Sequence, residues 1–346
     1  TDRSRGLGDV YKRQIKNHTT QKYKAVCKVR SRVRFALTGT PVENRLGELW
    51  SVFSFLMPGY LPPYKSFCSR FEKPIVQEED QTAVRRLNQL TGPFILRRMK
   101  SDVLKELPPK TENVYRIELE EEQRKLYLAA VVDAREKLQA AKPEDKMAVF
   151  AVLMRLREIC CDPRLIADNW EGGSAKLDAC AELVSSAVEG GHRILLFSQF
   201  TSMLELLAKR LDAEGISHFT LQGSTPKPVR AELVRRFNGG EVSVFLISLR
   251  AGGTGLNLTA ADIVIHYDPW WNVAAQNQAT DRAYRIGQQN PVQVYKLIAQ
   301  DTIEEKIVEL QQAKQSLADT VTGTADGAIL SMRPDELLQL LEGSEP

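Results

Sequence analysis

The stretch ILLFSQFTSMLELLAKRLDAEGISHFTL, residues 194–221, predicts a strand, a helix and a second strand in that order. ILLF (194–197) and HFTL (218–221) are short runs, rich in apolar side chains, with the length of buried strands. Between them, leucines recur at the spacing of one helix face: Leu204, Leu207 and Leu211. Two strands joined by an amphipathic helix are typical of a parallel sheet with covering helices.

The same alternation continues towards the C-terminus. Three more strands are predicted, at VFLI (244–247), IVIHY (263–267) and VYKLI (294–298). A helix is predicted over 228–237, and another begins after Thr302, which forms a Thr-x-x-Glu capping box with Glu305. We therefore predict one α/β domain over residues 174–345, with a doubly wound parallel sheet covered on both faces.

The first half of the chain is mainly helical by the same criteria. FALT (35–38) predicts one short strand. Four helices are predicted after it, at 46–56, 82–90, 120–139 and 146–161. Residues 168–174 contain two adjacent glycines and are typical of a linker. We therefore expect the end of one α/β unit over 1–45 and a helical region over 46–170.

The composition narrows the class of protein. The 346 residues are 43% hydrophobic and 26% charged, as in ordinary globular domains, and the net charge of +3 is too balanced to indicate nucleic acid by itself. The five cysteines form no C-x-x-C pair and the four histidines are scattered, so no metal site is predicted. An odd cysteine count without an apolar signal core predicts a reducing cytoplasm, and no apolar run has the length of a membrane span.

Two segments have the chemistry of phosphate-binding loops. ISLRAGGTGLNL (247–258) leaves a predicted strand and enters a turn with candidate residues Ser248, Arg250, Gly252, Gly253 and Gly255. LTGTPVEN (37–44) leaves another strand and offers Thr38, Gly39 and Thr40. An ordinary strand-to-helix turn remains the alternative for both segments.

The segment ATDRAYRIGQ (279–288) places Arg282 and Arg285 three residues apart. If the stretch is helical, both guanidinium groups point the same way, either towards an anion or into solvent as part of a charged helix face. Just before it, Trp270 and Trp271 are adjacent. Two neighbouring indoles are either part of the core or a surface that stacks against a partner.

Taken together, these segments resemble the Swi/Snf-type ATPases, which are superfamily-two helicase-like DNA translocases with two RecA-like lobes. Seven blocks occur in the family's order over about residues 15–342: LTGTPVENRLGELW, ILRRMKSDVLKELPPK, ILLFSQF, LQGST, SLRAGGTGLNLTAAD, DPWWN and QATDRAYRIGQ. The residues within these blocks are most similar to those of the bacterial branch of the family. The resemblance implies a RecA-like doubly wound sheet as the second helicase lobe, preceded by a mainly helical insertion and the end of a first RecA-like lobe.

The resemblance also assigns roles to residues. Arg282 and Arg285 resemble arginine fingers that reach the γ-phosphate of ATP, although Tyr284 stands where the family usually has His. Residues implied to orient this segment or to couple it to the nucleotide are Gln276, Asp281, Gly255, Thr38, Gly39 and Thr40. Residues implied to contact the DNA backbone are Gln222, Gly223, Ser224, Thr225, Ser248, Arg250, Gly252, Gly253 and Trp271.

An active enzyme of this type also needs a Walker A lysine and an acidic magnesium-binding box. No Gly-Lys dipeptide occurs in the chain, and VYKRQ (10–14) stands where the acidic box is expected. Lys12 cannot ligate magnesium. We therefore expect that residues 1–14 are not native family sequence, that the main ligands of ATP and Mg²⁺ lie outside this chain, and that the chain alone is inactive. The alternative is a non-catalytic DNA- or protein-binding module derived from such an ATPase.

The expected partner is double-stranded DNA, because the implied contacts are to the phosphate backbone and carry no sequence specificity. Proteins bound to DNA, such as RNA polymerase, are further expected partners, and no membrane is expected. The implied location is the cytoplasm, in association with the nucleoid.

Overall fold

The computed structural model describes residues 15, 17–37, 46–78, 80–96, 104, 106–142, 145–167, 169–249, 251, 255–318, 334, 337–338 and 341. The chain divides into two compact units, which are described separately below. One unit consists of residues 1–100 and 312–327, and the other of residues 101–311 and 328–346. The predicted boundary at 170–174 therefore lies inside the second unit rather than between the two.

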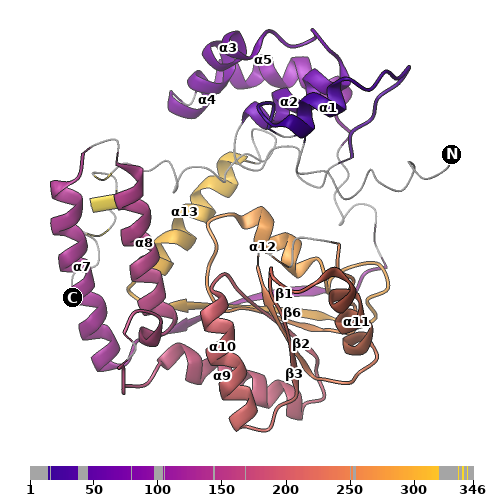
Figure 1. Ribbon diagram of the computed structural model, residues 1–346. Coiled ribbons are helices and arrows are strands. Elements are labelled where there is room, and N and C mark those ends of the chain that lie inside the picture. Colours follow the sequence, from indigo (N-terminus) through magenta and orange to yellow (C-terminus); the bar gives the residue numbers. More distant parts are fainter. Residues whose placement is uncertain are drawn as a thin grey trace. The chain divides into compact units, whose positions relative to one another are not determined.

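The second unit contains a six-stranded parallel sheet (Figure 1). Its strands are β1 (Lys110–Ile117), β2 (Ile194–Ser198), β3 (His218–Leu221), β4 (Val244–Ser248), β5 (Ile263–His266) and β6 (Val292–Ala299). They lie in the order β1-β6-β5-β2-β4-β3, and every neighbouring pair is parallel. The prediction of a parallel α/β sheet is confirmed, as are the five strands predicted between residues 194 and 298.

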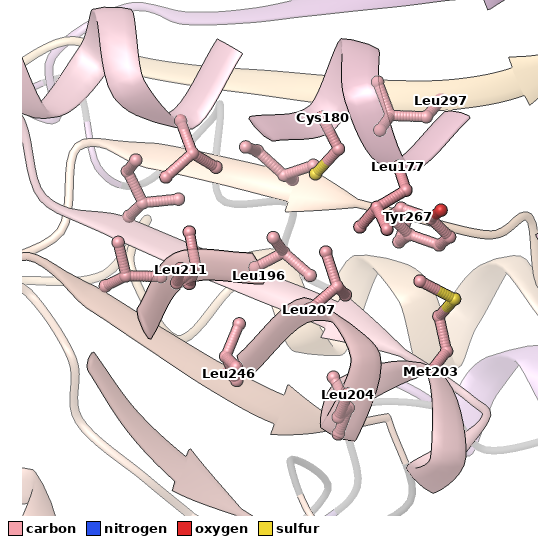
Figure 2. Packing of buried hydrophobic residues seen from close by; sticks show 14 of the residues in the cluster. Leu177, Cys180, Leu196, Met203, Leu204, Leu207, Leu211, Leu246, Tyr267 and Leu297 are labelled. Atoms are coloured by element: carbon pink, nitrogen blue, oxygen red, sulfur yellow. The ribbon is translucent and has the colours of Figure 1, made fainter. Parts of the chain in front are cut away.

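Helices cover both faces of this sheet, as expected for a doubly wound fold. On one face, α9 (Ala175–Glu189) and α10 (Thr201–Ala213) pack through Leu177 and Leu207 onto Leu196 and Leu246 of the central strands (Figure 2). On the other face, α11 (Lys227–Asn238) contributes buried Phe237, and α12 (Val273–Thr280) also packs there. The central strands are apolar on both sides because each side is covered.

The strand β1 was missed by the sequence patterns, which placed 46–170 in a mainly helical region. Lys110–Ile117 pairs in register with Val292–Ala299 along its whole length, but only Ile117 of β1 is buried. An edge strand with one buried side chain shows neither an apolar run nor a clear alternation. The α/β unit thus begins well before residue 174.

Two long helices follow β1 in the same unit. The predicted helices at 120–139 and 146–161 are confirmed as α7 (Glu121–Ala140) and α8 (Lys146–Cys161), and η3 (Pro163–Leu165) follows them. Residues of α7 and α8 form a buried cluster with the beginning of α13 (Ile303–Ala318) and with Leu337 and Leu341. Thr302 caps α13, since its Oγ1 accepts from Glu304 N at 3.2 Å, but the reciprocal bond of the predicted capping box is replaced: the Glu305 carboxylate accepts from Asp301 N, at 2.9 Å, and not from Thr302 N.

The first unit is helical in its described part. Its elements are α1 (Gln21–Cys27), α2 (Leu46–Leu56), α3 (Tyr64–Phe67), the π-helical η1 (Cys68–Glu72), α4 (Lys73–Gln77), α5 (Gln81–Thr91) and η2 (Gly92–Phe94). The predicted helices at 46–56 and 82–90 are confirmed by α2 and α5. Leu49, Phe53, Phe67 and Leu87 belong to its core.

The strand predicted at 35–38 is not present in its described part, residues 35–37. A strand exists only through hydrogen bonds to a neighbour, and the described residues of the first unit contain no other strand. Phe35 and Leu37 are accordingly 84% and 78% exposed. The sequence pattern identified apolar side chains of strand type, but the partner strand that they require is not among these residues.

Candidate functional site

The two arginines of interest follow the C-terminus of α12. The helix ends at Thr280, and residues 281–287 form successive turns instead of a continued helix. Arg282 N donates to Ala279 O at 3.1 Å, and Gly287 has a φ of +100°. Arg282 is partly buried and Arg285 is exposed. Since the helix does not continue, the argument that i and i+3 residues share one helix face does not apply to this pair.

The turn segment is fixed to the sheet and the preceding loop by three sets of contacts. The buried Gln288 side chain donates to Ala261 O at 2.7 Å and to Ala283 O at 3.2 Å. Leu258 N donates to Arg282 O at 3.0 Å. These bonds hold the backbone on both sides of Arg285, so that its exposed side chain projects from a defined base.

His266 supplies the third contact from within the sheet. Its Nε2 lies 2.9 Å from Thr280 Oγ1, and its ring stacks on Phe197 at 5.6 Å. Burial lowers the pKa of His266 to about 3, with further lowering from Lys296, so the imidazole is neutral at physiological pH. The neutral ring of His266 thus connects the end of β5 to Thr280, the last residue of α12, directly before the turns.

The residues implied to orient this segment lie beside it. Gln276 is buried on α12, and Asp281 directly follows the helix, with its N–H bonded to Asn277 O at 2.8 Å. The side chain of Asn272 caps the other end of α12 by accepting from Ala275 N. The orienting role of Gln276 and Asp281 stays a prediction, now with both residues on or next to one short helix.

The predicted DNA-binding segment 222–225 lies at the carboxyl end of β3. Thr225 N donates to Gln222 O at 3.2 Å, and Gln222 N donates to Thr225 Oγ1 at 3.1 Å, which closes a tight turn. Gly223 and Ser224 are exposed. Because Leu221 pairs with Ile247, this turn and Ser248 lie at the same edge of the sheet. Ser248 itself is buried, so its hydroxyl is not part of the exposed surface.

Several predicted site residues lie outside the described residues: Thr38, Gly39, Thr40, Arg250, Gly252 and Gly253. Gly255 is described and has a φ of +54°, a conformation that favours glycine. Gly255 is thus the first described residue after 252–254 in the glycine-rich loop that follows β4, and its backbone is left-handed. An ordinary strand-to-helix turn would account for this conformation equally well.

The tryptophan pair packs against α8. Trp271 is only 6% exposed, its ring centroid is 5.0 Å from that of Trp270, and the guanidinium carbon of Arg157 lies 4.4 Å from it. The interpretation of the pair as core is thus confirmed for Trp271, whereas Trp270 is half-buried. The role of Trp271 at DNA stays a prediction.

Arg157 is the residue of this region that sequence reasoning missed. Its Nη2 donates to Pro269 O at 2.5 Å and to Asp268 Oδ2 at 3.3 Å, and both side chains are buried. Asp268 Oδ1 also accepts from Ser198 Oγ at 2.6 Å and from Gln199 N at 3.1 Å. Burial raises the pKa of Asp268, and the Arg157 charge opposes that rise. In the sequence, Arg157 is an arginine next to Leu156 within an apolar helix pattern, which by itself does not indicate a buried ion pair.

A second buried ion pair joins α9 to α13. Lys176 and Glu304 are both fully buried and bonded to each other. Glu304 Oε2 also accepts from Ala299 N at 2.9 Å. Lys176 lies just after the linker predicted over residues 168–174, and this pair fixes the start of α9 to the end of β6.

Among the described residues, no group of three or more His, Cys, Asp or Glu side chains is arranged to hold a metal ion. Within the same residues, no helix combines the length and the apolar character that crossing a membrane requires.

Parallel strands covered on both faces, with an arginine segment after the fifth strand, define a RecA-like lobe of a helicase-like ATPase. Comparison with known families agrees with this class. The SNF2-related domain matches residues 12–165, and the helicase conserved C-terminal domain matches residues 175–287. The chain belongs to the SWI2/SNF2 family of helicase-like ATPases.

Individual relatives include bacterial and archaeal proteins. The chain is 40% identical over 335 residues to the putative ATP-dependent helicase/translocase YwqA of Bacillus subtilis, covering 94% of this chain and 36% of that protein. It is 39% identical over 333 residues to an uncharacterised ATP-dependent helicase of Mycoplasma genitalium, covering 95% of this chain and 32% of that protein. The chain thus spans about a third of the length of these curated relatives.

A solved structure supports the same family assignment. The Sulfolobus solfataricus SWI2/SNF2 ATPase core in complex with double-stranded DNA is 35% identical, with a TM-score of 0.58, over 94% of this chain and 70% of that one. The two family matches meet between residues 165 and 175, where the linker was predicted. The compact units divide instead near residue 100.

Proposed function

We propose that this chain is the C-terminal part of an ATP-dependent translocase that moves on duplex DNA. The observation that carries the proposal is the arginine segment, in which Arg282 and Arg285 project from turns fixed to the sheet by Gln288 and His266. Turns that are held in place suit an arginine that stabilises the negative charge of a transition state, because the arginine then needs little reorganisation during the reaction.

In this proposal Arg282 and Arg285 stabilise the γ-phosphoryl group of ATP during hydrolysis. A guanidinium is always charged and places two parallel N–H donors on phosphate oxygens. ATP with Mg²⁺ supplies the phosphoanhydride bond whose cleavage drives movement. Arginines in this role contribute about 10³- to 10⁵-fold to turnover. Gln276 and Asp281 keep the segment oriented, and Thr38, Gly39, Thr40 and Gly255 couple it to the nucleotide.

The DNA surface in this proposal is the edge of the sheet where β3 and β4 end. The turn Gln222–Thr225, with its exposed Gly223 and Ser224, contacts the phosphate backbone together with Arg250, Gly252 and Gly253 of the next loop. Trp271, whose side chain is largely buried, lies near the DNA strand in this proposal without forming part of the contact surface. Such contacts hold duplex DNA without reading its sequence. The whole protein would act in the cytoplasm, with the nucleoid, on DNA-bound proteins such as RNA polymerase.

The assignment of domains along the chain is also a proposal. Residues 1–45 are the end of the first RecA-like lobe, with 1–14 foreign to the family, and 46–170 are a helical insertion. Residues 174–345 are the second lobe, and the part of the insertion that contains β1, α7 and α8 belongs to the same compact unit as this lobe. The two family matches, which end at 165 and begin at 175, support the last boundary.

DNA binding is tested by fluorescence anisotropy with a short duplex over a salt series. We expect binding at low salt that weakens linearly on a logarithmic plot, because each phosphate contact releases counterions. Arg285→Ala serves as the control, since it removes a charge assigned to the nucleotide and should leave the affinity nearly unchanged. No binding of the wild type at low salt would remove the DNA surface from the proposal.

The catalytic part is tested in two steps. The chain alone should show no DNA-stimulated ATPase activity, and clear turnover that Arg285→Ala abolishes would contradict this. A chimera in which residues 15–346 of this chain replace the matching segment of the Bacillus relative, which keeps its own sequence upstream of that point, should hydrolyse ATP. Arg285→Ala in the chimera should lower kcat by about 10³-fold or more. Undiminished turnover after that substitution would refute the arginine-finger assignment.

The second candidate function is a non-catalytic DNA-binding module. The exposed turn Gln222–Thr225 favours it equally, since it does not depend on the nucleotide. The chimera separates the two candidates. A chimera that binds DNA normally and never hydrolyses ATP supports the binding module, and DNA-stimulated turnover supports the translocase.

A further inference from the structure

The turn Gln222–Thr225 rests on a single side chain of the following helix. Arg230 of α11 donates from Nε to Thr225 O at 2.8 Å, and from Nη2 to Gly223 O at 2.8 Å and to Gln222 O at 3.2 Å. One guanidinium thus binds three carbonyl groups within four residues. Its planar fork allows this, whereas a lysine ammonium has no such geometry.

The direction of these carbonyls decides where the neighbouring N–H groups point. In a trans peptide the C=O and the N–H lie on opposite sides of the bond, and the described residues contain no cis peptide. The carbonyls of Gln222 and Gly223 face Arg230, so the amides of Gly223 and Ser224 face away from it. Within the described residues, neither amide donates to another protein group.

The outward side of the turn therefore presents two consecutive N–H donors. Gly223 and Ser224 are exposed, so the hydroxyl of Ser224 is available beside them, and a methyl group added at Gly223 would meet nothing within 4 Å. Carbonyl oxygens repel an anion, but here they are turned inward and satisfied by a cation. Consecutive backbone amides of this kind suit a phosphate oxygen.

We infer that Arg230 is a positioning residue that turns this loop so that the amides of Gly223 and Ser224 receive a phosphate of the DNA backbone. The inference rests on the proposed DNA surface and identifies what gives that surface its shape. We assign Arg230 a role that acts through the loop, because its Nε and Nη2 are bonded to the loop carbonyls.

Three variants separate positioning from simple charge. Arg230→Lys keeps the charge and loses the fork, and Arg230→Gln loses both. Arg235→Gln is the matched control, because Arg235 lies on the same helix, is exposed, and within the described part of the chain its side chain donates to Glu232 alone. Anisotropy with a short duplex at low salt measures the affinity of each variant.

We expect both Arg230 variants to bind DNA at least about ten-fold more weakly than the wild type, since two hydrogen bonds to a charged phosphate are lost. Arg235→Gln should bind within about two-fold of the wild type, as expected for one screened surface charge. If Arg230→Lys binds like the wild type while Arg230→Gln and Arg235→Gln weaken alike, charge alone explains the effect and the inference fails.

A second readout observes the two amide groups directly, by NMR, and its main comparison uses the wild-type protein. The ¹⁵N and ¹H amide signals of Gly223 and Ser224 in the wild type should shift on addition of the duplex, and more weakly with inorganic phosphate. In Arg230→Gln the same signals should stay in place. If the wild type binds the duplex and these two signals do not move, the inference is wrong and the DNA surface stands. If the wild type binds no duplex, the proposed function fails, and the phosphate titration alone decides whether the amides receive an anion.

Discussion

The buried pair of Arg157 and Asp268 allows a sharp test of how the tryptophan loop is held. Arg157→Met keeps most of the side-chain volume but removes the cation, leaving the Asp268 carboxylate with hydrogen bonds from Ser198 and Gln199 only. Removing one member of a buried ion pair destabilises by about 3–5 kcal/mol. Loss of the guanidinium stacked on Trp271 adds roughly 0.5–2 kcal/mol, part of which the methionine sulfur restores.

The same structure predicts how this cost depends on pH. Burial already raises the pKa of Asp268, and removal of Arg157 takes away the charge that opposes the rise. A carboxyl whose folded pKa exceeds its unfolded pKa binds a proton more readily in the folded state, so its contribution to stability improves as pH falls towards the unfolded value. The destabilisation by Arg157→Met should therefore be largest at pH 8 and should become smaller as the pH falls through the folded pKa towards the unfolded value of about 3.9.

Urea unfolding followed by tryptophan fluorescence measures both effects. A Trp50→Phe background removes the fluorescence of the first unit, so that the signal comes from the second unit. Arg155→Met is the control, because it is the same change on the exposed side of α8 and should alter stability by at most about 0.5 kcal/mol. A loss below about 1 kcal/mol at pH 8, or one that does not change with pH, would refute the buried-charge reasoning.

Two further predictions concern the base of the arginine segment. The imidazole of His266, with a pKa lowered to about 3, should show no ring-proton titration in NMR between pH 8 and pH 5. Because unfolded histidine gains a proton near pH 6.5, the free energy of unfolding should fall below that pH by up to about 1.4 kcal/mol per pH unit from this residue, and a ring titration near 6.5 would contradict the assignment. Gly287→Ala should destabilise by about 1 kcal/mol or more, since φ is +100° there. Gly223→Ala, at a position without a positive φ and with open space for the methyl group, should change urea stability by less than about 0.5 kcal/mol, and equal losses in the two variants would disprove the role of φ.

The strands that could be predicted from the sequence are those whose two faces are both buried. The side chains of β2 and β4 are buried on both faces, so the first four residues of each strand are apolar, which is the pattern of a covered parallel strand. β1 could not be found in this way, because its stability comes from pairing with β6 and its side chains are mostly exposed. FALT (35–38) shows the converse, since its composition is that of a strand but no described neighbour pairs with residues 35–37.

The same distinction applies to the site. Arg282 and Arg285 could be selected from sequence because their spacing and neighbours form a compact block, but the turns that carry them depend on long-range contacts of Gln288 and His266. Arg157 could not be selected, since an arginine within an apolar helix pattern reads as an interruption. Its partner Asp268 is 111 residues away, and only the fold brings the two together.

The buried contacts of Arg157 bear on how the lobe would move. The sequence families divide the chain between 165 and 175, which would place α8 with the segment before it. Separating α8 from the loop at Asp268–Trp271 would leave a carboxylate and a guanidinium without each other, and the expense of several kcal/mol makes that separation rare. The Lys176–Glu304 pair imposes the same condition on α9 and α13, one on each side of this loop in sequence. Helices α7 and α8 must therefore move with the parallel sheet as one body. Any displacement of the tryptophan loop is then transmitted to them directly, and the division between the two compact units falls before β1 and not at the boundary between the two family matches.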